Sequence, residues 1–407
     1  MLPLIAVLFA ALLAIASISS AIEGARCDAV FYQLPQTGNK DIDQVLGLIS
    51  SKYHGKDIDR LWESNPVQKY LQKNGITESY KLSDFERIQW LGKYLHGYLS
   101  PYRNETLLEK KRERAWKRAL RFHGYESDVR LTARQNIEEL SRSNRMRIMG
   151  NETYISTPEM KEAEEVVNNL EPFLAHNSHI MREAPRYPVI APSEIEKMGL
   201  PDFSMSSMEF NRFIGSTDHV YFFIKFRNNK GSSKMRSEYG EYGVVVKSEY
   251  AQKTAWVSPF IMYRYDLYAA SRKADPEVAE AFKKKMAVID KDGNESWNSR
   301  YGRVDHQAEI LQALKTVHKF DFTVSDFESI VKTQLLISLR KLKSEEPDKY
   351  ISALKIIEKL GTGNEKNDKE AWELFYQLVY RPLKMPSYFE GRIPVAVPDT
   401  ELVHFAK

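Results

Sequence analysis

Residues 215–226 read GSTDHVYFFIKF and residues 238–247 read EYGEYGVVVK, and these two stretches decide the fold. Each contains a run of β-branched or aromatic residues behind small or polar ones; such runs favour strands, and the residues before them favour turns. Two Tyr-Gly steps, at Tyr239 and Tyr242, open the second run. Glycine lets a backbone or a ligand approach closely, and the neighbouring ring offers a flat face. We therefore predict two strands at the centre of a small β domain, with a pocket beside them.

The chain has 407 residues, of which 43% are hydrophobic and 28% are charged. This length and composition support one or two well-packed domains. The formal charge of +4 is small, and the basic residues are spread over both halves of the chain. The sequence therefore predicts no nucleic-acid partner.

Residues 1–21 carry no charged side chain and form an apolar run that ends in small residues. Ser19 and Ala21 suit the two small positions before a signal-peptidase cut, so we predict a cleaved signal peptide and a secreted protein. No later stretch is apolar enough to span a membrane. Cys27 is the only cysteine, so the fold relies on its core and not on an internal disulfide.

Apolar residues spaced three and four apart predict helices over residues 42–50, 85–99 and 107–122. The last of these is strongly basic and includes Trp116 and Leu120. A basic amphipathic helix can dock on an acidic partner such as calmodulin. The alternative is a helix with solvated charges on one side and an ordinary core on the other.

Further along the chain, residues 157–174 read as a helix that Thr157 caps. Residues 254–270 are a mixed segment dense in aromatic side chains. Residues 382–398 are rich in proline and predict an irregular tail. Helical spacing also predicts three helices in the C-terminal part, over residues 308–317, 326–342 and 350–359.

The sequence contains neither a glycine-rich phosphate loop nor a Gly-x-Ser-x-Gly nucleophile turn. One remaining hypothesis is a metal-dependent hydrolase, since histidine and carboxylate side chains are zinc ligands. Its ligands would come from the following set, whose spacing fits no defined motif: His176, His179, His219, Asp305 and His306.

A second hypothesis places an aromatic shelf beside a histidine and a carboxylate. The shelf would consist of residues 221–223 together with Tyr239 and Tyr242. Aromatic faces stabilise a flat cationic ring, and a carboxylate offsets the charge that develops at a sugar's anomeric carbon when that ring departs. The alternative is that these aromatic residues simply form a core.

Four short motifs occur in a fixed order: FLAHNS at residues 173–178, DHVYFF at 218–223, EYG at 238–240 and VDHQ at 304–307. This order resembles the catalytic region of the OspC-like type III effectors, the arginine ADP-riboxanases, over about residues 157–390. The resemblance implies an ADP-ribosyltransferase-like fold, NAD as the co-substrate and arginine of a host protein as the target.

The resemblance also implies the binding residues. His176 would position the NAD ribose, and Phe223 would form an aromatic wall around the nicotinamide. Tyr221, Phe222 and Tyr239 would complete that wall.

The family's catalytic glutamate falls on Asp305, whose side chain is one methylene shorter. His306 would help to position this carboxylate, and Glu309, one turn further on, is the alternative. The family is activated by calmodulin, and the basic helix is compatible with that. The family's C-terminal ankyrin repeats are missing here, and its members lack the Sec signal that this chain has.

We therefore expect an α+β protein in which a helical N-terminal region packs on a small mixed β-sheet of the ADP-ribosyltransferase-like type, followed by helices. The expected divisions are a signal peptide (1–21), a helical domain (22–156), a catalytic domain (157–320), and C-terminal helices with a proline-rich tail (321–407). The expected function is a secreted, effector-like enzyme that uses NAD to modify a protein side chain. The alternatives are a secreted interaction protein without catalysis and the metal-dependent hydrolase.

Overall fold

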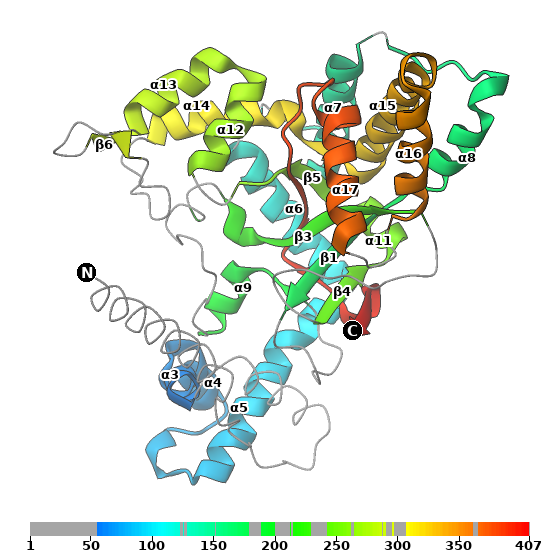
Figure 1. Ribbon diagram of the computed structural model, residues 1–407. Helices are drawn as coiled ribbons and strands as arrows, with labels where there is room; N and C mark the ends of the chain where they lie inside the picture. Colours follow the sequence, from blue (N-terminus) through cyan, green and yellow to red (C-terminus); the bar gives the residue numbers. More distant parts are fainter. Residues whose placement is uncertain are drawn as a thin grey trace, which may run out of the picture. The chain divides into compact units, whose positions relative to one another are not determined.

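The chain forms two compact units, Met1–His96 and Gly97–Lys407. The computed structural model describes residues 55–122, 125, 128–150, 152–178, 189–199, 212, 215–228, 242–261, 264–286, 288–289, 295–296, 307–360 and 365–406. Every described strand belongs to the second unit (Figure 1). The predicted signal peptide and the predicted helix over 42–50 lie outside the described residues.

The described part of the first unit is helical. It contains α3 (Gly55–Glu63), α4 (Asn65–Lys73) and most of α5 (Asp84–Leu99). Ser83 caps α5, because its Oγ accepts from the Glu86 N–H at 3.4 Å while Glu86 Oε2 accepts from the Ser83 N–H at 2.8 Å. The helix predicted over 85–99 is confirmed.

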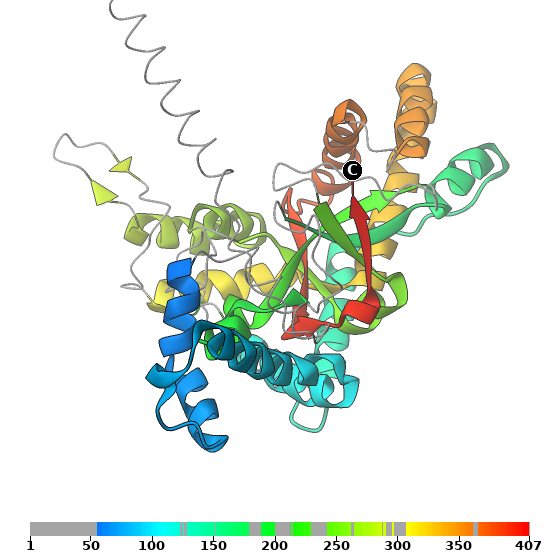
Figure 2. The ribbon, with the colours of Figure 1, turned by 90° about the horizontal axis from the view of Figure 1, so that it is seen from below.

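A seven-stranded sheet lies at the centre of the second unit. Its order is β11 (Leu402–Ala406), β4 (Tyr242–Val246), β1 (Glu171–Ser178), β3 (His219–Arg227), β9 (Phe389–Pro394), β5 (Trp256–Pro259) and β8 (Phe322–Thr323). Figure 2 shows these strands side by side, with the C-terminal β11 next to β4. Every pairing described in this sheet is antiparallel. The fold is α+β as expected, but the expectation of a mixed sheet was wrong.

Both strands predicted at the outset are confirmed as β3 and β4, and they are not adjacent, because β1 lies between them. The helix predicted over 157–174 ends early: α8 covers Lys161–Asn168, and the chain then enters β1 at Glu171. Pairing of β1 with both β3 and β4 overrides the helical pattern here.

The irregular tail predicted over 382–398 was also wrong. Residues 389–394 form β9, which is buried along its whole length and fills the place between β3 and β5. Gly391 permits close packing there, because a Cβ on it would lie 2.3 Å from Cδ2 of Leu174. The sheet thus combines strands from both sides of residue 320, the border expected between the catalytic domain and the C-terminal helices.

The two faces of the sheet differ in character. We call core face the side that carries Val220, Phe222 and Phe226 of β3, which belong to the largest hydrophobic cluster. The helices that contribute apolar side chains to that cluster include α8, α15 (Val324–Glu345), α16 (Pro347–Glu358) and α17 (Glu365–Phe375). The helices predicted over 326–342 and 350–359 are confirmed as α15 and α16.

We call polar face the opposite side of the sheet, which carries the residues at alternate positions. On β5 it presents Trp256, which packs with Trp116 and Leu120 of α6 (Glu105–Phe122) and with Ile137 of α7 (Ala133–Met149). The helix predicted over 107–122 is therefore confirmed, and its apolar side lies against the sheet.

A separate cluster joins α12 (Arg264–Ala274), α13 (Pro276–Met286) and α14 (Gln307–Val317), which confirms the helix predicted over 308–317. In Figure 1 these helices stand apart from α15, α16 and α17. The shorter elements are α9 (Pro192–Lys197), α11 (Ser248–Thr254), the π-helix Tyr376–Tyr380, and the paired strands β2 (Val189–Ile190) with β10 (Ala396–Val397) and β6 (Val288–Ile289) with β7 (Glu295–Ser296). Among the described helices, none combines the length and apolar character needed to cross a membrane.

Candidate functional site

The strands β1, β3 and β9 are neighbours, and they carry the described members of the predicted NAD site. His176 lies on β1, and Tyr221, Phe222 and Phe223 lie on β3. The other members do not enter this description: Asp305, His306 and Tyr239 fall outside the described residues.

The His176 ring is held from two sides. Its Nδ1 lies 3.0 Å from the carbonyl oxygen of Tyr221, and its ring meets Phe222 edge-on, with centroids 5.9 Å apart. A carbonyl oxygen only accepts, so the contact assigns a proton to Nδ1. The half-buried His176 ring is therefore held in a fixed orientation.

The three aromatic residues of β3 do not form one wall. Phe222 is 1% exposed and belongs to the core face, whereas Tyr221 and Phe223 are half-buried and point to the polar face. Phe222 therefore packs in the core and contacts His176 from that side. The expected grouping of all three rings around one nicotinamide was wrong, since successive strand residues face opposite ways.

A buried ion pair that the sequence reading missed lies beside Tyr221 and Phe223 on the polar face. In the register of β3 and β9, Phe223 is opposite Glu390 and Tyr221 is opposite Arg392. Directly opposite residues of an antiparallel pair place their Cβ atoms about 5 Å apart on one face. The structure thus brings two aromatic side chains next to a carboxylate and a guanidinium.

The guanidinium of Arg392 is held on several sides. Its Nε and Nη2 each lie 2.9 Å from Oε1 of Glu390, and Nη2 donates to the carbonyl oxygen of Pro259 at 3.2 Å. The rings of Tyr221 and Trp256 lie 5.6 and 5.9 Å from its central carbon. Such contacts with aromatic faces stabilise a cation where water is excluded.

Further polar residues lie beside Glu390, on the neighbouring strand β5 and in the turn before β8. Ser258 lies opposite Glu390 on β5, and its Oγ donates to Oδ1 of Asp321 at 2.6 Å. Oδ2 of Asp321 is hydrogen-bonded to Nδ1 of His318. Asn144 of α7 donates to the carbonyl oxygen of Asp321 at 2.9 Å, which ties this turn to α7.

Burial shifts two ionisable groups of the polar face. The pKa of Glu390 is raised to about 7, chiefly by burial, with Arg392 opposing the rise and Asp266 and Asp321 adding to it. The pKa of His219 is lowered to about 4, first by burial and then by the positive charge of Arg392. The His219 ring stacks on Trp256 with centroids 6.0 Å apart, so it is a neutral packing group near neutral pH.

Glu309 takes no part in this cluster. It lies in the first turn of α14, whose apolar residues pack with α12 and α13. Among the described residues, no hydrogen bond or ion pair joins Glu309 to the three strands.

The metal hypothesis finds no support in the described part of the chain. No group of three or more histidine, cysteine, aspartate or glutamate side chains there is placed to hold a metal ion. Of the proposed ligands only His176 and His219 are described, and they point to opposite faces of the sheet; His179, Asp305 and His306 lie outside the described residues.

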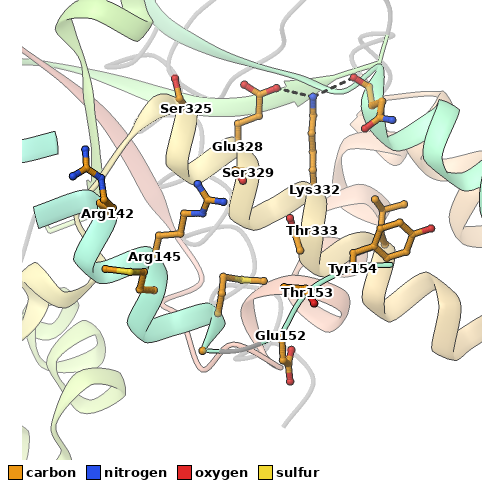
Figure 3. Close-up of a pocket in the computed structure, with 15 residues that line it drawn as sticks. Arg142, Arg145, Glu152, Thr153, Tyr154, Ser325, Glu328, Ser329, Lys332 and Thr333 are labelled. Atoms are coloured by element: carbon orange, nitrogen blue, oxygen red, sulfur yellow. Dashed lines mark hydrogen bonds and ion pairs between the residues drawn. The ribbon is translucent and has the colours of Figure 1, made fainter. Parts of the chain in front are cut away.

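An open groove of about 760 Å³ lies between α7 and α15 (Figure 3). Arg142 and Arg145 extend from α7, and Glu328, Ser329 and Lys332 stand along α15. Most of its charges are paired within the protein: Lys332 lies 2.6 Å from Glu328, and Arg145 lies 3.3 Å from Asp326. The groove therefore contains no concentrated charge for a ligand.

The basic helix α6 is part of the packed structure. Trp116 and Leu120 are 5% and 1% exposed, and Arg112, 3% exposed, donates to the carbonyl oxygen of Ala396 at 3.0 Å. Docking of this helix on calmodulin through its apolar side would require it to leave these contacts.

No protein-family model and no curated protein matches this sequence.

Proposed function

We propose that the protein is an NAD-dependent transferase that modifies a protein side chain, most simply arginine, in a target protein outside the producing cell. The observation that carries this proposal is the placement of Tyr221 and Phe223 directly across from Arg392 and Glu390. This placement supplies the aromatic faces and the carboxylate that the transfer reaction needs. Both lie on the polar face of the sheet, where the carboxylate is buried. The finer assignment of the fold, to the ADP-ribosyltransferase-like type, is part of this proposal.

In this proposal Tyr221 and Phe223 lie against the nicotinamide ring of NAD, whose positive charge favours aromatic faces. The bond between nicotinamide and the anomeric carbon of the ribose breaks, and nicotinamide leaves as a neutral base. A nitrogen of the target's guanidinium bonds to that carbon and loses a proton. Positive charge develops on the ribose between these events, and a carboxylate stabilises it.

Glu390 supplies this carboxylate more simply than Glu309, which lies on α14, a helix that packs with α12 and α13. Its raised pKa means that it is ionised only in part near neutral pH. A cationic ring bound beside it favours the ionised form and lowers that pKa. His176, to which the resemblance assigned the ribose, lies on the core face of the sheet, opposite to Tyr221 and Phe223, and has no role in this proposal.

The proposal is tested with residues 22–407, NAD labelled in its adenosine part, and a eukaryotic lysate with and without calmodulin. Transfer of label to a discrete band is expected, together with a loss of at least about 100-fold in Glu390→Gln, as when a group that stabilises the transition state is removed. The matched control is Glu373→Gln, which removes an exposed carboxylate of α17 and should leave transfer unchanged.

The same assay separates the carboxylates. Loss of transfer in Asp305→Ala or Glu309→Ala, with Glu390→Gln fully active, would move the catalytic role back to the residue that the sequence motif suggests. No transfer by the wild type and no NAD binding by calorimetry would exclude the transferase and favour the secreted interaction protein.

A further inference from the structure

Three aromatic rings form a stack at the end of α17. The Trp372 ring stacks with Tyr376 at a centroid distance of 5.7 Å and an interplanar angle of 11°, and with Tyr388 at 5.4 Å and 21°. We call this set the ring stack. Trp372 is 38% exposed and Tyr388 is 62% exposed. Parallel aromatic side chains that reach the surface are a flat apolar platform.

The ring stack is fixed before any ligand arrives. Tyr376 packs partly against the main core and begins a π turn, in which the Arg381 N–H donates to the Tyr376 carbonyl oxygen at 2.9 Å. The carbonyl oxygen of Tyr388 accepts from the Phe260 N–H at 3.1 Å. Such turns occur often at functional sites, and side chains held in place lose little entropy when a ligand binds.

The segment that supplies two of the rings is positively charged. Residues 374–389 include Arg381 and Lys384 and contain no acidic residue. Both basic side chains are exposed, and Arg381 Nη1 donates to Gln377 at 3.1 Å. Arg381 follows Tyr376 by five residues, and in a regular α-helix two such residues lie about 140° apart around the axis. The π turn reduces this angle and brings Arg381 nearer to the side on which Tyr376 lies.

We propose that the ring stack is a binding site for a nucleotide. The base lies against the exposed aromatic surface and continues the series of parallel rings, and the phosphate pairs with Arg381 and Lys384. Bases stack on aromatic side chains whatever their sequence, since every base has a flat π face. Basic residues in the segment that carries two of the rings complement the phosphate, which a neutral sugar or a proline-rich peptide would not require. The residues of this site differ from those of the NAD site on the sheet.

The first experiment is calorimetric titration of the protein (residues 22–407) with AMP. Tyr388→Ala and Trp372→Ala should each weaken AMP binding by about fivefold or more, the range found when one stacking ring is removed. Tyr388→Phe keeps the ring and should bind as the wild type does. The matched control is Tyr265→Ala. Tyr265 is also exposed, at 57%, but its ring and that of Tyr268 are inclined by 49°, so the two do not form a parallel stack.

The phosphate contact is tested by a double variant, Arg381→Gln with Lys384→Gln, which should weaken AMP binding but leave adenosine binding unchanged. Titration with a short single-stranded oligonucleotide distinguishes a site for a nucleic-acid strand from a site for a free nucleotide. If the oligonucleotide binds more tightly than AMP, and the same ring variants abolish this binding, the site is assigned to the nucleic-acid strand. AMP contains no bond to nicotinamide, so these measurements do not depend on transferase activity.

AMP binding that persists in both ring variants would overturn the proposal, as would a wild type that binds no AMP. Loss of AMP binding in Glu390→Gln, with Tyr388→Ala unaffected, would place the nucleotide at the sheet and also overturn it. Circular dichroism of each variant confirms that the fold is retained.

Discussion

Arg392 and Glu390 lie two residues apart on β9 and pair with each other inside the sheet, with Nε and Nη2 of Arg392 each 2.9 Å from Glu390 Oε1. They are 3% and 5% exposed. Two charges buried together stabilise each other, and removing one leaves the other without a partner in a medium of low polarity. The pair is therefore a requirement of the fold as well as a candidate part of the site.

We expect Glu390→Ala to lower the free energy of unfolding by about 3–5 kcal/mol, the usual cost of breaking a buried ion pair. Urea denaturation at pH 8, where Glu390 is ionised, measures this loss. The double variant Glu390→Leu with Arg392→Met should recover much of it, because no buried charge remains. Arg130→Ala, which breaks a surface pair with Asp128, should cause no measurable loss; an equal loss there would contradict this account.

The pH dependence of stability should reveal the raised pKa of Glu390. Its pKa in the folded protein is about 7 against an ordinary value of 4.5, so the folded state holds the proton more tightly than the unfolded state. The stability from this group is complete below pH 4.5 and is lost as the pH rises to about 7. Compared with Glu390→Gln, the wild type should lose about 3 kcal/mol across this interval in urea titrations, at about 1.4 kcal/mol per pKa unit. A constant difference between the two proteins would refute the shift.

His219 should show the opposite sign. Its pKa in the folded protein is about 4 against an ordinary 6.5, so the unfolded state binds the proton more readily. The stability that it contributes is present above pH 6.5 and is lost as the pH falls to about 4. His219→Phe keeps a ring against Trp256 without titrating, so the wild type should lose about 3 kcal/mol more than this variant between pH 7 and pH 4. Thermal melts of both proteins at pH 7 and pH 4 measure this difference. An equal loss of stability in the two proteins would disprove the prediction.

Close packing at Gly391 predicts an interaction between two substitutions. In Gly391→Ala the new Cβ would lie 2.3 Å from Leu174 Cδ2, so the variant should lose about 1–3 kcal/mol through overpacking. Leu174→Ala alone should cost about 2–5 kcal/mol, because it leaves a cavity. The double variant should be more stable than the sum of these effects predicts, since the added methyl group enters the space that the leucine vacates. Strictly additive denaturation free energies would show that the two side chains do not meet.

The sequence predicted the elements whose signal is local. The Val220–Phe226 run, the three valines of β4 and the helical spacing of α5, α6, α14, α15 and α16 all identify the correct element. Short-range propensity decides these segments, and tertiary contacts agree with it.

The sequence-based prediction failed for the segment whose structure depends on pairing with strands that are distant in the sequence. β9 contains a glycine and ends in a proline, and both are signs of a loop when the segment is considered alone. It is a strand because β3 and β5 bind it on either side. The available signal was the alternation of Glu390 and Arg392 with Phe389 and Ile393, since a period of two residues is typical of a strand. However, two charged residues on a buried strand need partners, and no local sequence pattern reveals them.

The expected site and the arrangement on the sheet agree only in part. An aromatic shelf beside a carboxylate and His176 was expected; Tyr221 and Phe223 lie beside Glu390, whereas His176 lies on the opposite face of the sheet. The carboxylate comes from a strand far along the chain, and Phe222 turns to the other face. Only the register of the sheet decides which side chains meet, and one sequence does not contain that information.

The position of β9 after β3 and β5 in the chain also determines when this sheet can be completed. A ribosome delivers β1, β3, β4 and β5 first, and β3 and β5 have an open edge toward each other until residues 389–394 emerge. Hydrogen-bonding groups on open strand edges bind other extended chains readily. The unfinished polypeptide therefore depends on a chaperone, or on delayed folding, until β9 has been synthesised.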